Sequence, residues 1–115
     1  MSTAIKLPLS GSVDGKGIKI TTIASPGTLI HTATSATSGI YDEIWLWAYN
    51  DDVYNITIFI EWGDSDLARK ITIPLQTGVI PLIPGFILQN SQVVRIYANT
   101  ANKIKIDGFV NRITN

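Results

Sequence analysis

The chain has 115 residues, of which 45% are hydrophobic and 16% are charged, and nine Lys and Arg balance nine Asp and Glu. This length supports one domain with a single core. Zero net charge and scattered basic residues argue against a nucleic acid or an anionic membrane as partner, and the lack of cysteine excludes disulfides and thiolate metal sites.

The N-terminal segment, residues 1–17, is rich in Ser, Gly and Thr, and Ile5, Leu7 and Leu9 alternate with polar positions in it. This pattern predicts an arm or an edge strand followed by a flexible turn. We expect residues 18–115 to form a single β-sandwich domain. Within it, residues 18–25 and 28–35 are rich in β-branched side chains and are expected to be strands.

Residues 40–50 give the strongest strand signal. Ile44, Leu46 and Ala48 alternate with three aromatic residues, so both faces are apolar, which is typical of a central strand. Residues 53–62 alternate in the same way after a short polar turn. We therefore predict a hairpin between these two strands.

Further short strands are expected at 67–74, 78–84, 85–88, 92–98 and 103–113. No window repeats apolar residues at helical spacing, so the fold class is all-β. About eight short strands predict a two-sheet antiparallel β-sandwich. A jelly-roll-like order is preferred, an immunoglobulin-like order is the alternative, and a small barrel is less favoured.

Residues 71–94 contain no charged side chain, yet they are not expected to cross a membrane. Prolines and glycines interrupt every apolar run, whereas a spanning helix needs about 20 apolar residues. The prolines indicate an edge strand or a bent corner. Because a chain with few charges exposes apolar surface, we expect a homo-oligomer. The expected subunit-interface residues are Ile80, Leu82, Ile83, Phe86 and Ile87.

Trp45, Trp47 and Tyr49 occupy one face of the strand at 40–50. Aromatic side chains dominate cores and interfaces, and the low charge content favours that they are covered, so we expect core or intersubunit packing. The alternative is that they are exposed and stack against sugar rings.

Catalytic chemistry has little support in the sequence. His31 is the only histidine and is expected to be a surface or hydrogen-bonded residue, and no nucleophile–base pattern accompanies it. Asp42 and Glu43 are strand neighbours that point to opposite faces. Asp64 and Asp66 could offer oxygens to Ca²⁺, but turn chemistry is the preferred interpretation. We expect no enzyme activity, no cofactor and no metal site.

Three segments resemble small virion proteins of tailed bacteriophages, especially marine and cyanobacterial phages, that decorate or cement the capsid. The segments are "IWLWAYN…ITIFIEWG", "KITIPLQTGVIPLIPGFIL" and "VVRIYANTANKIKIDGFVNRI". The similarity spans roughly residues 27 to 113, and the ending "IKIDGFVNRI" is its most specific part.

The resemblance implies a capsid decoration protein that holds neighbouring capsid subunits together. Its partners would be its own copies, in a trimer, and the major capsid protein. It would be made in the host cytoplasm and act on the capsid surface of the virion. In the alternative interpretation the chain is a carbohydrate-binding β-sandwich module or a receptor-binding component of a tail or fibre.

Overall fold

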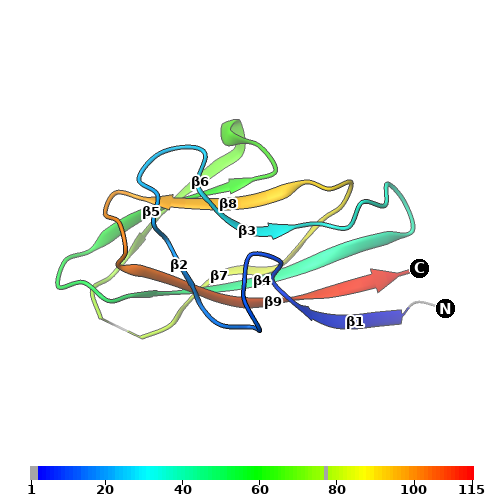
Figure 1. Ribbon diagram of the computed structural model, residues 1–115, viewed down its shortest axis with the longest axis horizontal. Coiled ribbons are helices and arrows are strands. Elements are labelled where there is room, and N and C mark those ends of the chain that lie inside the picture. The colour runs from blue at the N-terminus through cyan, green and yellow to red at the C-terminus, as the bar shows by residue number, and fades with distance from the viewer. Residues whose placement is uncertain (1–2, 77) are drawn as a thin grey trace.

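A computed structural model describes residues 3–76 and 78–115 and shows two antiparallel sheets packed face to face (Figure 1). Sheet A has the strand order β1-β9-β4-β7, with the short strand β2 also paired to β9, and sheet B has the order β3-β8-β5-β6. The elements are β1 (Thr3–Pro8), β2 (Ile18–Lys19), β3 (Thr28–Thr32), β4 (Ile40–Asn50), β5 (Ile56–Trp62), η1 (Ser65–Leu67), β6 (Ala68–Ile73), β7 (Ile80–Leu88), β8 (Val93–Ala98) and β9 (Ile104–Thr114).

The predicted two-sheet β-sandwich is confirmed. Without the two-residue strand β2, the sheet orders 1-9-4-7 and 3-8-5-6 are those of an eight-stranded jelly roll, because successive strands mostly alternate between the sheets. The long strands β4 and β9 form the centre of sheet A, and they pair along their whole lengths, from Ile40 opposite Thr114 to Asn50 opposite Ile104.

The core lies between the sheets and consists almost entirely of aliphatic side chains. Strand alternation explains their selection: every second residue of β4, β5, β8 and the first part of β9 points inward. The largest fully buried side chains are Leu9, Ile20, Ile30, Ile44, Leu46, Ile56, Ile58, Ile60, Ile73, Ile96, Ile104 and Ile106.

The predicted hairpin between residues 40–50 and 53–62 is wrong. β4 pairs with β7 and β9 in sheet A, whereas β5 pairs with β6 and β8 in sheet B. The turn after Asn50 therefore carries the chain from one sheet to the other. Both segments have one strongly apolar face, and the fold buries these faces against each other instead of placing them side by side in one sheet.

From Thr3 onward, the N-terminal segment belongs to the sandwich. β1 pairs with β9 along its whole length and forms one edge of sheet A. Beyond it, Leu9 is buried in the core, and the Gly11 amide donates to the Ile30 carbonyl of sheet B at 2.9 Å. The segment after β1 thus passes from sheet A to sheet B.

β7 forms the other edge of sheet A, as the prolines at positions 81 and 84 predict. Its pairing with β4 is irregular at two places, between Ile44 and Trp45 and between Leu46 and Trp47. Proline has no N–H donor, and bulges interrupt a regular hydrogen-bond ladder. This edge is therefore a poor template for the addition of another strand.

Candidate functional site

The aromatic residues of β4 lie outside the core. Trp45, Trp47 and Tyr49 point to the outer face of sheet A and are half-buried, while the residues between them are fully buried on the inner face. Phe109 of β9 lies opposite Trp45 in the sheet and joins them. We call these four residues the aromatic face. The three β4 aromatics do not fill the core, because the opposite side of the strand fills it, and their expected intersubunit packing stays a prediction.

The rings of the aromatic face pack against one another. Phe109 lies nearly parallel to both tryptophans, with ring centroids 6.1 Å from Trp45 and 5.9 Å from Trp47 and interplanar angles of 14° and 27°. Lys6 of β1 places its ammonium 4.6 Å from the Phe109 ring centroid. Such contacts add about 0.5 to 1.5 kcal/mol each beyond the burial of area, so they fix the rings in place.

Polar contacts fix Trp45 in addition. Its indole Nε1 donates a hydrogen bond of 2.8 Å to Glu43 Oε1, and Asn111 Nδ2 donates to the same oxygen at 3.2 Å. The indole also leans over Gly85 of β7. A Cβ atom at Gly85 would meet Trp45 Cζ2 at 2.7 Å, and its φ of +84° is one that residues with side chains rarely adopt. Gly85 therefore makes room for the ring.

A cleft of about 490 Å³ lies at the Tyr49 end of the aromatic face. Its lining consists of Gly17, Lys19, Tyr49, Val79, Lys105 and Asp107. Lys105 reaches over the Tyr49 ring at 5.9 Å from the centroid and also forms an ion pair of 2.8 Å with Asp51. The cleft thus combines an aromatic ring with charged groups of both signs.

The five interface candidates of β7 do not share one environment. Ile83 is 4% exposed and belongs to the core, so the expected interface role is wrong for this residue. Ile80 and Leu82 are partly buried and pack against the core. Phe86 and Ile87 are exposed, and the Phe86 ring meets Trp62 of β5 edge-on at 6.1 Å. The irregular pairing of β7 explains why adjacent residues are both exposed.

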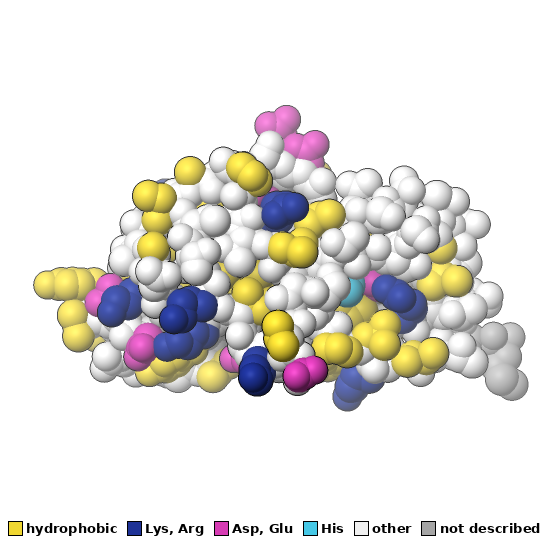
Figure 2. All heavy atoms as spheres, viewed as in Figure 1, with side chains coloured by type: hydrophobic (Ala, Val, Ile, Leu, Met, Phe, Trp, Pro, Cys, Tyr) yellow, Lys and Arg dark blue, Asp and Glu magenta, His cyan; other side chains and the backbone are white. Residues whose placement is uncertain are grey.

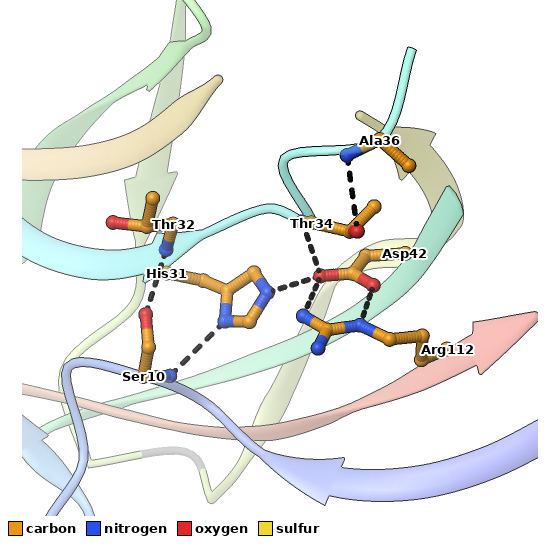
Figure 3. Close-up of polar contacts among 7 residues, drawn as sticks. All are labelled: Ser10, His31, Thr32, Thr34, Ala36, Asp42 and Arg112. Carbon is orange, nitrogen blue, oxygen red and sulfur yellow. Dashed lines mark hydrogen bonds and ion pairs between the residues drawn. The ribbon is translucent and has the colours of Figure 1, made fainter. Parts of the chain in front are cut away.

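A second polar group, buried between the sheets, involves residues that the sequence did not bring together (Figure 3). His31 of β3 is 2% exposed, and its Nε2 lies 2.7 Å from Oδ2 of Asp42 on β4, which is fully buried. Arg112 of β9 donates to both oxygens of Asp42, from Nε at 2.7 Å and from Nη2 at 3.0 Å. Arg112 reaches this buried pair from the surface, with 36% of its side chain exposed, and we call the three residues the buried triplet after His31 and Asp42.

Hydrogen bonds define the protonation pattern of the buried triplet. The Ser10 amide donates to His31 Nδ1 at 3.0 Å, so the ring carries its proton on Nε2 and donates it to Asp42. The Ser10 hydroxyl instead accepts from the Thr32 amide. In a nucleophile–base pair the hydroxyl donates to the imidazole. Here the backbone amide of Ser10, and not its hydroxyl, donates to His31, so Ser10 and His31 do not form such a pair. The triplet joins β3, β4, β9 and the turn after β1.

Burial raises the pKa of Asp42, but the hydrogen bonds from Arg112 and His31 and the positive charge of Arg112 outweigh it. Together they hold the pKa of this carboxyl below its ordinary value of 3.8. Asp42 is therefore a carboxylate at neutral pH. The Thr34 amide donates to it as well, at 3.1 Å.

Two further carboxylates, Asp64 and Glu61, have local structural roles. Asp64 caps the short helix η1, where its side chain accepts from the Asp66 amide at 3.0 Å. Glu61 lines a smaller cleft of about 280 Å³, and its oxygens accept from the Ser25 hydroxyl and the Gly27 amide. Both carboxylates stabilise turns.

Sequence reasoning found three residues of the aromatic face but missed Phe109. The alternation of the last strand could have placed Phe109 on the face opposite Ile106 and Val110. It could not have placed Phe109 beside Trp45, because the register of β9 with β4 was unknown. The buried triplet had no comparable signal, since its members are up to 81 positions apart.

Comparisons with protein-family models, with curated proteins and with solved structures found no match for this chain. Across the two described ranges, no helix is long and apolar enough to cross a membrane.

Proposed function

We propose that this chain is a structural protein of a bacteriophage virion: a capsid decoration, or cement, protein. It would bind neighbouring capsid subunits and assemble with its own copies, as a trimer. The resemblance of residues 27 to 113 to such proteins motivates the proposal, and the jelly-roll order is one that viral capsid proteins use among many others.

The observation that carries the proposal is the exposed apolar surface along the edge strand β7. Phe86 and Ile87 are 46% and 55% exposed, and Val79, just before the strand, is 57% exposed. Large apolar side chains exposed along one edge strand are typical of a surface that contacts protein. Since Pro81 and Pro84 remove backbone donors, side chains rather than an added strand would make the contact.

A cement protein binds through several weak contacts that the symmetry of the particle repeats. A rigid sandwich with an adhesive edge suits this task. The direct test is mass spectrometry of purified virions. We expect the chain to be present in a constant ratio to the major capsid protein, and its absence from intact particles would overturn the proposal.

The role of the β7 edge can be tested separately with Ile87→Asp. Placing a carboxylate in an apolar contact costs several kcal/mol, so we expect the oligomer to dissociate at tens of micromolar protein in sedimentation velocity. Ile23→Asp is the matched control, because Ile23 is 64% exposed in the loop between β2 and β3. An oligomer that tolerates Ile87→Asp as well as it tolerates Ile23→Asp would exclude β7 from the interface.

A further inference from the structure

The aromatic face lies outside the core and borders the proposed β7 contact, since Ile87 pairs with Glu43 and Val79 lines the cleft at Tyr49. Its rings are half-buried by one another and present their remaining area to the outside of sheet A. Along β4, alternate residues are about 7 Å apart, so the row from Trp45 to Tyr49 is longer than one small ring-shaped ligand. An extended ligand fits this row better than a compact one.

Charged side chains lie near the rings, while on the β7 side Trp45 and Trp47 lie opposite Pro84 and Pro81. Lys6 lies over Phe109, Glu43 holds Trp45, and Lys105 lies over Tyr49. In Figure 2, Lys, Arg, Asp and Glu side chains stand close together over β2 and β9 in the lower part of the view. The centres of protein interfaces are depleted of Lys, Asp and Glu, so this composition disfavours a second copy as the occupant.

Charges of both signs flank the aromatic face. Lys6, Lys19, Lys103 and Lys105 face Glu43, Asp51 and Asp107, and Lys105 and Asp51 already form an ion pair. A nucleic acid or another polyanion needs a larger excess of cations. The mixed charges therefore favour a neutral ligand whose own groups can both donate and accept hydrogen bonds.

A neutral carbohydrate chain has this chemistry. One side of a sugar ring presents C–H groups, which pack on the negative face of an aromatic ring, and its rim carries hydroxyl groups that donate and accept. Carboxylates and the Asn111 carbonyl can accept from those hydroxyls, and lysines can donate to them. Ring–ring and ring–glycine contacts hold Trp45 and Phe109 in place before a ligand arrives, which lowers the entropy cost of binding.

The cleft at Tyr49 supplies the concave end of the surface. Its volume of about 490 Å³ falls within the range of small-ligand sites, about 300 to 1,000 Å³. Asp107 packs against Gly17, where a Cβ atom would meet its Oδ1 at 2.9 Å, and a larger residue there would crowd the carboxylate. The cleft thus places Tyr49, Lys19 and Asp107 around one space.

We infer that the outer face of sheet A binds a neutral carbohydrate chain. One sugar unit enters the cleft on Tyr49, and the next unit stacks on Trp47. This function is additional to a structural role in a virion and does not depend on it.

Affinity electrophoresis tests the inference, with the full chain run in native gels that contain dextran, mannan or laminarin, all neutral polysaccharides. We expect at least one of them to retard the wild type. Trp47→Ala and Tyr49→Ala should each weaken that binding about tenfold, the loss expected for one stacked ring. Tyr97→Ala is the matched control, because Tyr97 stacks on Phe59 at 4.7 Å on the outer face of sheet B, and it should bind like the wild type.

Three results would overturn the inference. The first is no retardation of the wild type by any of the three polysaccharides, the second is retardation of Trp47→Ala and Tyr49→Ala as strong as that of the wild type, and the third is binding to heparin alone. Circular dichroism identifies a variant that fails to fold, and two independent ring variants guard against that loss. Sedimentation of Trp47→Ala adds a further check, since dissociation of an oligomer would identify the face as a contact between copies.

Discussion

The two faces of strand β4 show how one alternating sequence meets two different demands. On the inner face, Ile44, Leu46 and Ala48 are fully buried against sheet B. On the outer face, Trp45 and Trp47 are larger and also apolar, yet they stay half-exposed. Both of their rings stack with the ring of Phe109. The difference teaches that apolar character alone does not decide burial, because the second sheet covers only one side.

We expect the inner face of β4 to contribute more to the stability of the domain than the outer face. A pair of alanine variants tests this difference. We expect Leu46→Ala to lower the free energy of unfolding by about 3 kcal/mol, because it leaves a cavity in a closed core. Trp47→Ala should cost about 1 kcal/mol, since its ring is only half-buried and contacts one side. Urea unfolding measures both, and a larger loss for Trp47→Ala would show that the aromatic face is a covered structural layer.

Gly85→Ala tests how closely the Trp45 indole packs on β7 at the outer face. A Cβ atom there would strike the Trp45 indole, and the backbone would have to keep a positive φ. We expect a loss of about 1 to 2 kcal/mol in unfolding free energy, with a change in tryptophan fluorescence as the ring moves. Unchanged fluorescence and stability would mean that Trp45 does not rest on Gly85 in solution.

The smallest expected effect is the loss of stability on acidification, and it arises from Asp42 on the inner face. Because the pKa of Asp42 is lower in the folded protein than its ordinary value of 3.8, its contribution to stability is present above that value. This contribution is lost as pH falls through the folded pKa. Thermal unfolding at several pH values should show this decline below about pH 4.

Asp42→Asn provides the control for the acid experiment. The variant loses the carboxylate that Arg112 and His31 share, so it should be less stable at pH 7. Its stability should then change less than that of the wild type between pH 5 and pH 3. Parallel curves for the two proteins would assign the acid sensitivity to other groups.

Much of the fold was readable from alternation, because strands bury every second residue. The inward set Ile56, Ile58, Ile60 and Trp62 follows directly from the sequence, as does the edge position of β7 from its prolines. Strand pairing was less accessible. The hairpin predicted after Asn50 failed, because a short polar turn can also lead from one sheet to the other.

For the candidate site, the sequence identified the residue types and the structure supplied their neighbours. Phe109 joined Trp45 and Trp47 only through the register of β9 with β4. The separation of Ile83 from Ile87 into core and surface depended on the irregular pairing of β7, which shifts the alternation. Local patterns do not encode such register shifts, since these arise from contacts between distant strands.

The sequence alone showed that the chain has zero net charge, that its fold is all-β and that one strand is apolar on both faces. It could do so because composition and period-two alternation are local properties. Only the tertiary structure decided that sheet B covers the aliphatic face of β4 and leaves the aromatic face outward. It also brought Arg112 from β9 to the buried pair of His31 and Asp42, which come from two other strands. The physical reason is that burial and pairing are set by the packing of two sheets, and residues far apart in the chain make those contacts.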